Sequence, residues 1–209
     1  MKVIDLLATS LNKRDDKANQ ALALEIIKGS HADWIKELVE NLCHKDKNIQ
    51  SDCIKVLYEI GEQGAPELIA PHLRDFGRTL GSKNNRLIWG AMTAIDMISS
   101  VNPGEVFKLL PEIINAIEKG SVITIDHGVG ILANLSADSR FAPKTFPLLV
   151  EQLIKCPVKQ LPMYAEKSLA AVNQNNKKQF AEILESRLPE TEKDSQKKRL
   201  MAIIKKLKM

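Results

Sequence analysis

An internal repeat constrains this chain more than any other feature of its sequence. Six apolar segments align without gaps when one position is placed in register, about 33 to 38 residues apart, at Ile27, Ile60, Ile98, Leu135, Val172 and Leu207. A second apolar position precedes it by three residues, at Leu24, Leu57, Ile95, Leu132, Leu169 and Ile204. Apolar residues at spacings of three and four share one face of a helix. The repeat therefore predicts six amphipathic helices.

Each of these helices follows another apolar helical segment, as WIKELVENL precedes CIKVLYEI, so the chain is predicted to form helical hairpins. A single hairpin cannot bury its apolar face alone, and successive hairpins must stack. The predicted fold is all-α, a right-handed α-solenoid (α-α superhelix) of about six hairpins. It forms a single domain over 1–209, with approximate repeats 1–30, 31–64, 65–102, 103–140, 141–175 and 176–209.

Prolines inside the predicted first helices indicate the kind of repeat. Pro71 lies in IAPHL, Pro111 in LLPEI and Pro147 in TFPLL. A proline removes a backbone donor and bends a helix. With these kinks and its unequal helix pairs, the chain resembles the HEAT-like helical-repeat family, although that family's aspartate at the inter-helix turn occurs only in RDDKA and HKDKNIQ. A tetratricopeptide array is the alternative, but its Trp, Leu-Gly and Tyr pattern does not recur.

The helical register also predicts which side chains face outward. Residues eight and five positions before the first apolar column leave the buried stripe, and second helices line the concave surface of such solenoids. We expect a mostly polar ridge there, for which two interpretations stay open: a groove for a protein or peptide partner, or an ordinary solvated helix face. The ridge residues are Asp52, Lys55, Arg86, His127, Tyr164 and Lys167.

The stretch TIDHGVGIL, residues 124–132, looks like a catalytic pair beside a phosphate loop until it is aligned with the repeat. Asp126 and His127 then fall at the front of a second helix and point in different directions around it. Gly128 takes a position held by Cys53 in another repeat, which predicts close helix approach. Gly130 has no structural requirement and costs the helix about 1 kcal/mol relative to alanine. His127 is therefore predicted to be an exposed ridge residue.

A second, more distant resemblance is to the HEAT-like DNA glycosylases for alkylated bases, because Trp89 and Asp126 occupy equivalent positions in neighbouring repeats. Those enzymes use Trp, Asp and Arg in a cleft rich in aromatic residues. Here Thr93 stands one helical turn after the tryptophan, where the family has its acid, and aromatic residues make up only 4% of the chain. Trp89 is predicted to be a packing residue.

No pattern typical of catalysis, cofactor binding or metal binding occurs. The four histidines lack H-x-x-x-H or H-E-x-x-H spacing, and there is neither a G-x-S-x-G elbow nor a G-x-x-x-x-G-K-[ST] phosphate loop. The three cysteines form no C-x-x-C pair, and their odd number favours buried thiols in a cytoplasmic protein. We expect a protein that is not an enzyme, uses no cofactor, and binds a protein or peptide partner as a scaffold.

The net charge of +4 is concentrated at the C-terminus, where residues 190–209 hold seven Lys or Arg against three acids. The helix over KDSQKKRLMAIIKKLKM is predicted to bury Leu200, Ile203, Ile204 and Leu207 and to expose its cations. Two interpretations stay open: the polar end cap that a solenoid needs, or a docking patch for nucleic acid, a membrane surface or an acidic protein. No apolar run is long enough to span a bilayer, and MKVIDLLATSL is predicted to be the first helix. The basic patch residues are Lys197, Lys198, Arg199, Lys205 and Lys206.

Overall fold

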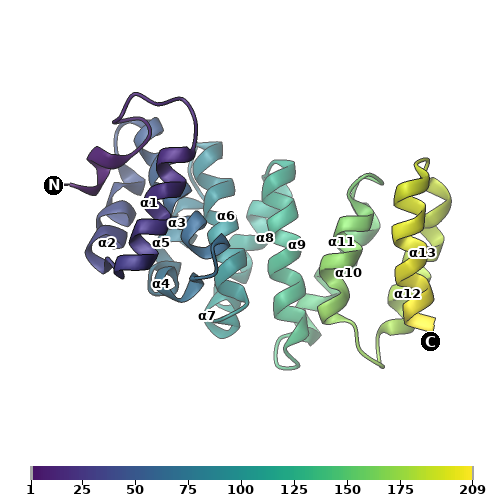
Figure 1. The fold of residues 1–209 in the computed structure, drawn as a ribbon. Helices are drawn as coiled ribbons and strands as arrows, with labels where there is room; N and C mark the ends of the chain where they lie inside the picture. The colour runs from purple at the N-terminus through teal and green to yellow at the C-terminus, as the bar shows by residue number, and fades with distance from the viewer. Residues whose placement is uncertain (1, 209) are drawn as a thin grey trace. The chain divides into compact units, whose positions relative to one another are not determined.

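A computed structural model describes residues 2–208, and these residues form helices and connecting loops without any strand. The chain divides into two compact units (Figure 1). Unit 1 contains the described residues up to Gly128 and unit 2 begins at Val129, so the boundary falls within helix α9. The all-α fold predicted from the repeat is confirmed.

Unit 1 contains the helices of the first repeats, with the second helices of the hairpins being α1, α3, α6 and the beginning of α9. In chain order its elements are η1 (Val3–Leu6), α1 (Lys17–Gly29), α2 (Ala32–Glu40), η2 (Asn41–Cys43), α3 (Lys47–Glu62), α4 (Pro66–Ile69), η3 (Ala70–His72), α5 (Leu73–Thr79), α6 (Asn85–Ser99), α7 (Pro103–Phe107), α8 (Leu110–Lys119) and α9 (Val122–Ala137).

Unit 2 contains the last hairpins and the end of α9. Its elements are α10 (Ala142–Lys155), α11 (Leu161–Ser168), η4 (Leu169–Ala171), α12 (Lys177–Arg187), η5 (Leu188–Glu190) and α13 (Asp194–Lys208). α13 packs against α11 and α12, and α10 packs against the same two helices. The predicted front of a second helix at TIDHGVGIL is thus confirmed as the first part of α9.

The polar links between the two helices of a hairpin begin the second helices by capping them. The Asp46 side chain accepts a hydrogen bond from the Asn48 N–H at the start of α3, and Asn84 does the same for the Arg86 N–H at the start of α6. These contacts satisfy backbone donors that the first turn of a helix leaves without a partner. The boundaries of α3 and α6 therefore follow from local sequence.

The three prolines interrupt the first helices to different degrees. At Pro71 the chain passes from α4 through the short η3 to α5, and Pro111 lies in the first turn of α8, after α7 has ended. Pro147 instead lies inside the continuous helix α10. The predicted kinks thus become complete breaks in two repeats, because proline cannot donate the backbone hydrogen bond that would carry the helix through.

The predicted apolar stripe forms the core in the middle repeats. Leu57 and Ile60 of α3 and Ile95 and Ile98 of α6 are fully buried, and α3 packs against both α1 and α6. Near the N-terminal end of the chain the prediction is wrong at one position. Leu24 of α1 is 45% exposed, because the outermost helix has a neighbour on one side only.

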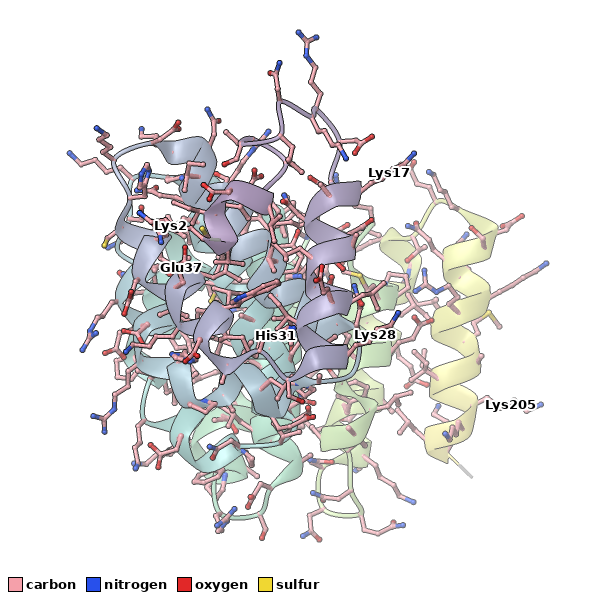
Figure 2. All side chains as sticks on the ribbon, turned by 60° about the vertical axis from the view of Figure 1, so that its left-hand side comes forward. Lys2, Lys17, Lys28, His31, Glu37 and Lys205 are labelled. Atoms are coloured by element: carbon pink, nitrogen blue, oxygen red, sulfur yellow. The ribbon has the colours of Figure 1, made fainter. Side chains whose placement is uncertain are left out.

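The expected first helix is also wrong, since only Val3–Leu6 is helical, as a short 3-10 helix. The segment that follows packs on α1 instead, with Leu7 and Ala8 buried. The buried face of α1 is consequently Asn19, Leu22, Ala23 and Ile26, rotated by one residue from the predicted stripe. Glu37 of α2 faces this segment, and its Oε2 accepts from the Val3 N–H at 3.1 Å (Figure 2).

The three cysteines are free thiols, and Cys43 is exposed, contrary to the expectation that all three are buried. Cys43 ends the short helix η2, whose inward position is taken by Leu42. Within residues 2–208, no helix combines the length and the apolar character needed to cross a membrane.

Candidate functional site

Second helices of unit 1 gather a group of polar and aromatic side chains, which we call the acid–aromatic cluster. α1, α3 and α6 lie side by side (Figure 1), and α3 packs against each of the other two. The cluster consists of Lys55, Tyr58, Glu59 and Glu62 from α3, Trp89 and Asp96 from α6, and His127 from α9.

Lys55 lies at the centre of these contacts. Its Nζ donates to Glu59 Oε1 at 2.5 Å, lies 3.7 Å from Asp16 Oδ2, and stands 4.7 Å from the centre of the Tyr58 ring. Burial alone would lower the pKa of the ammonium, but the hydrogen bonds to Glu59 and Tyr58 outweigh burial and raise the pKa. Lys55 is therefore held in its charged form, with its side chain only 15% exposed.

The pKa values of two glutamates in the cluster are shifted in opposite directions. Glu59 is buried, which favours the neutral acid, yet the hydrogen bonds from Lys55, Gln20 and Gln63 prevail and lower its pKa. Glu62 as a whole is exposed, but its carboxyl group is partly desolvated. This desolvation and the charge of Glu59 raise the pKa of Glu62. Glu59 thus keeps its charge to a lower pH than an ordinary glutamate does, while Glu62 gains its proton before Glu59 as pH falls.

The aromatic part of the cluster joins α3 to α6. The Tyr58 and Trp89 rings are 5.7 Å apart between centroids and tilted by 53°, which is a favourable geometry for an aromatic pair. Tyr58 is buried, whereas Trp89 is half-buried and keeps part of its surface in solvent. Gly90 makes this approach possible, because a Cβ there would lie 2.8 Å from Ile54 Cγ1.

His127 joins the beginning of α9 to α6. Its Nδ1 lies 2.8 Å from Oδ2 of Asp96, a residue that is buried. The side chain is only 19% exposed, so the prediction of an exposed histidine is wrong. His127 instead lies against the neighbouring helix, to which it is hydrogen-bonded. The prediction for Gly128 fits the structure, because a Cβ there would stand 2.3 Å from Ile117 Cγ1 of α8.

Two further ridge residues of unit 1 have distinct environments. Asp52 accepts from the Thr9 N–H at 2.7 Å and from Asn19 Nδ2 at 2.9 Å, so its carboxylate holds the N-terminal segment. Arg86 is exposed in the first turn of α6. Of the ridge residues in this unit, Lys55 and His127 belong to the acid–aromatic cluster. Asp52 instead accepts hydrogen bonds from the N-terminal segment and from Asn19, and Arg86 is the one that is exposed.

The remaining ridge residues, Tyr164 and Lys167, lie on α11 in unit 2. Tyr164 is only 1% exposed, which contradicts its expected place on a solvated face, and Lys167 is half-buried. The reason lies in the short length of α11, which ends at Ser168 and buries Leu161, Ala165 and Ser168 together with Tyr164. The outward-facing positions predicted from the longer second helices therefore do not apply to α11.

The basic patch on α13 is exposed, with one member engaged. Arg199 forms a bidentate ion pair with Glu166 of α11, at 2.7 Å from Nε to Oε1 and 2.5 Å from Nη2 to Oε2. Lys198, Lys205 and Lys206 are exposed, and Lys197 is half-buried. The predicted apolar face is confirmed, since Leu200, Ile203 and Ile204 are buried and Leu207 is half-buried.

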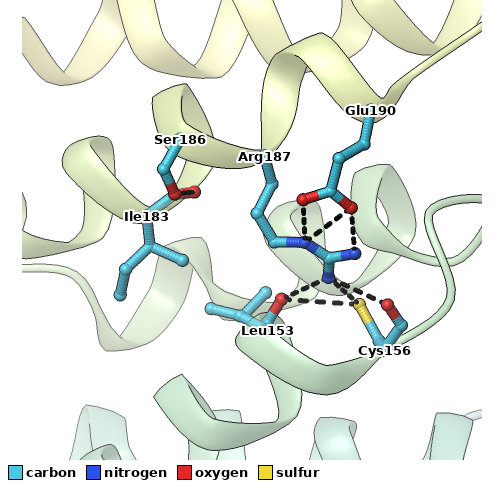
Figure 3. A network of polar contacts seen from close by, with 6 residues as sticks. All are labelled: Leu153, Cys156, Ile183, Ser186, Arg187 and Glu190. Carbon is cyan, nitrogen blue, oxygen red and sulfur yellow. Dashed lines mark hydrogen bonds and ion pairs between the residues drawn. The ribbon is translucent and has the colours of Figure 1, made fainter.

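A polar network that the repeat pattern did not predict lies in unit 2 (Figure 3). Arg187 ends α12 and donates through Nη1 to the Leu153 carbonyl at 2.9 Å and the Cys156 carbonyl at 2.8 Å. Its Nη2 donates to Glu190 at 2.6 Å. The guanidinium thereby satisfies carbonyls at the end of α10. Burial raises the pKa of the adjacent Cys156 thiol.

A groove of about 740 Å³ opens on other elements of unit 1, between α2, η2, α5 and the start of α6. Its lining combines apolar Leu42 and Leu87 with Lys36, Cys43 and Arg78. The groove contains none of the residues that the sequence predicted for a site. Among the described residues, no group of three or more His, Cys, Asp or Glu is placed to hold a metal ion.

The comparisons with known proteins identify the fold through structure alone. No protein-family model matches the chain, and no curated protein matches it. A designed armadillo repeat protein in complex with the peptide (KR)4 is similar over 99% of this chain and 100% of its own, with a TM-score of 0.68 and 16% identity. A computationally designed armadillo repeat protein for modular peptide recognition covers 97% of each chain, with a TM-score of 0.67 and 17% identity.

A crystal structure of an engineered protein is similar over 99% of this chain and 97% of its own, with a TM-score of 0.66 and 20% identity. These similarities span nearly the whole chain. The class is therefore an all-α helical-repeat array with the armadillo-like, α-α superhelical fold, consistent with the first helices that break at Pro71 and Pro111.

Proposed function

We propose that this protein is a non-enzymatic scaffold that binds a basic peptide segment of a partner protein at the acid–aromatic cluster. The observation that carries the proposal is the composition of the cluster. Glu59, Glu62 and Asp96 supply three carboxylates against the single ammonium of Lys55; Glu62 is exposed, Glu59 and Asp96 are buried, and a half-buried indole lies beside them. Such a surface favours cations, through opposite charge and through the negative face of an aromatic ring.

The fold supports the same proposal. A designed armadillo repeat protein of similar structure is in complex with the peptide (KR)4, whose side chains are all cationic. Peptide binding along the second helices also agrees with the absence of any catalytic motif in the sequence. Arg86, exposed at the start of α6, adds one positive charge near the N-terminal end of these helices and would disfavour a fully basic segment there.

Trp89 provides a direct test, because it is one of two tryptophans. The other, Trp34, stacks on His31 at the start of α2, and the substitution Trp34→Phe leaves Trp89 as the sole reporter. Titration of this variant with (KR)4 should change the emission of Trp89 and saturate, and an acidic peptide of the same length should give no change. Equal responses to the two peptides, or no saturable response to (KR)4, would reject the proposal.

Variants locate the binding site. Glu62→Gln removes one exposed carboxylate of the cluster and should weaken (KR)4 binding about fivefold, a loss on the scale of one partly screened charge pair. Glu118→Gln makes the same change on the solvent side of α8 and serves as the matched control. If both substitutions weaken binding equally, attraction is spread over the surface and the cluster is not the site.

A second candidate function rests on the exposed lysines of α13. Lys198, Lys205 and Lys206 have no ion-pair partner among the described residues, so they are available to phosphate oxygens of nucleic acid. A gel shift with duplex DNA and with RNA at low ionic strength tests this alternative, because the phosphate term is strongest there. If substituting all three lysines by glutamine does not weaken the complex, this alternative is rejected.

A further inference from the structure

The side chain of Lys55 occupies the part of the acid–aromatic cluster that is best suited to a cation. Its Nζ contacts Glu59 Oε1 at 2.5 Å and stands 4.7 Å from the Tyr58 ring centre. Asp16 Oδ2 lies on another side of the same nitrogen, at 3.7 Å. An anion, a second acid and an aromatic face around one ammonium are the contacts that a lysine of a bound peptide would make.

Glu59 does not depend on Lys55 alone for its hydrogen bonds. Gln20 Nε2 donates to Oε1 and Gln63 Nε2 donates to Oε2, both at 3.2 Å. The carboxylate therefore stays partly satisfied if the ammonium leaves, and it would present a negative charge to an incoming cation.

Lys55 is held by one partner on its own helix and one partner that is exposed. Its partner Glu59 is four residues away on the same helix, and Asp16 is 67% exposed. The pair with Glu59 is largely buried, at 15% and 9% exposed side chains, so it holds Lys55 more firmly than a surface pair would, but a lysine stem is flexible enough to carry its ammonium to solvent. Displacement of Lys55 by an external cation is consequently a small rearrangement of one side chain.

We propose that Lys55 is a resident competitor, whose ammonium fills the cation subsite formed by Glu59, Tyr58 and Asp16 and is displaced by a lysine or arginine of the bound peptide. This inference rests on the proposed function, because it concerns the same surface. It makes Lys55 a determinant of affinity and specificity: peptides with a cation that reaches this subsite bind, and neutral peptides leave Lys55 in place.

The test compares (KR)4 binding among variants of the full chain that all carry Trp34→Phe. Lys55→Met keeps the length of the side chain but removes the competitor, and it should tighten binding about three- to tenfold. Lys55→Arg restores a resident cation and should return the affinity to within about twofold of the parent. Lys83→Met removes a charge from an exposed lysine in the turn before α6 and should change the affinity far less than Lys55→Met.

Each outcome bears on one of the two proposals. If the parent binds (KR)4 and Lys55→Met binds equally or more weakly, the competitor role is wrong and the proposed function stands. If Lys83→Met tightens binding as much as Lys55→Met, general charge explains the effect and the competitor role is again wrong. If no variant binds (KR)4, the proposed function fails and this inference fails with it. Should Lys55→Met not fold, judged by circular dichroism and urea unfolding, Lys55→Gln replaces it, since an amide can still donate to Glu59 without a charge.

Discussion

The two units of the chain use charged side chains in different ways. In unit 1, polar groups connect successive second helices side chain to side chain: Asp52 with Asn19, Glu59 with Gln20, and His127 with Asp96. In unit 2, Arg199 and Glu166 also join two second helices, but there Arg187 in addition binds the backbone at the end of α10. Polar groups that meet between helices can be reorganised by a ligand, whereas a guanidinium that satisfies carbonyls serves stability.

The largest expected effect comes from the network of unit 2. Arg187→Ala leaves the carbonyls of Leu153 and Cys156 without their donor and Glu190 without its cation. We expect the free energy of unfolding to fall by about 3 kcal/mol, as measured by urea unfolding. Arg140→Ala is the control, since Arg140 pairs with Asp138 at an exposed site and its loss should leave the unfolding curve unchanged. Equal effects of the two substitutions would contradict the comparison between structural and surface arginines.

The next effect concerns the N-terminal segment of unit 1. Asp52→Ala removes the acceptor of the Thr9 N–H and of Asn19 Nδ2, and Asn19 is fully buried. The expected loss of stability is about 2 kcal/mol, accompanied by faster proteolytic cleavage before Lys17. The exposed Glu118→Ala on α8 should show neither change. Unaltered proteolysis of Asp52→Ala would mean that buried Leu7 and Ala8 hold the segment without this carboxylate.

Close helix approach in unit 1 predicts a smaller loss. An alanine Cβ at Gly128 would lie 2.3 Å from Ile117 Cγ1, so Ile117 must move. The cost of overpacking exceeds the gain in helix propensity, and we expect a net destabilisation of about 1 kcal/mol. Gly81→Ala, where a Cβ meets nothing within 4 Å, should be neutral. Thermal unfolding of the two variants side by side decides whether Gly128 is required for packing.

The pH dependence of peptide binding tests whether the carboxylate of Glu62 takes part in the binding site of unit 1. Because the pKa of Glu62 is raised, this carboxylate gains its proton first as pH falls from 7, and the lost charge should weaken (KR)4 binding by up to about fivefold. The charge is retained, and binding is strongest, above that pKa. In Glu62→Gln the decline over the same pH range should be smaller, and parallel curves for the two proteins would exclude Glu62 as its cause.

The smallest effect is expected for Arg199→Ala in unit 2. The ion pair of Arg199 with Glu166 has good geometry, but both side chains are more than 40% exposed, and surface pairs contribute about 0.5 kcal/mol or less. Urea unfolding should barely distinguish this variant from the parent. A loss as large as that of Arg187→Ala would show that Arg199 is needed to dock α13 on α11.

Much of the fold could be predicted from the residues, because helical periodicity is a local property. The stripe through Leu57, Ile60, Ile95 and Ile98 is buried as expected, and the capping residues Asp46 and Asn84 begin their helices. The prediction was wrong where a neighbour is lacking or unexpected. Leu24 is exposed, Asn19 is buried beneath the N-terminal segment, and Tyr164 is buried on a helix too short for the general register.

The candidate site was predicted in part. The sequence indicated Lys55 and His127, and the spacing of Lys55 and Glu59 alone could have indicated an ion pair along α3. It could not indicate that Tyr58 meets Trp89 or that Asp96 meets His127, since these partners are about 31 residues apart and belong to different helices. Such contacts depend on how far one helix is rotated and shifted against the next.

The sequence by itself determined that this protein is an array of helical hairpins, because apolar side chains at a helical period must be buried and a hairpin can bury them only against its neighbours. Only the tertiary structure decided which polar residues became partners. Hydrogen bonds and ion pairs act over a few ångströms, so the packing of α3 between α1 and α6 brought Gln20 to Glu59 and Trp89 to Tyr58.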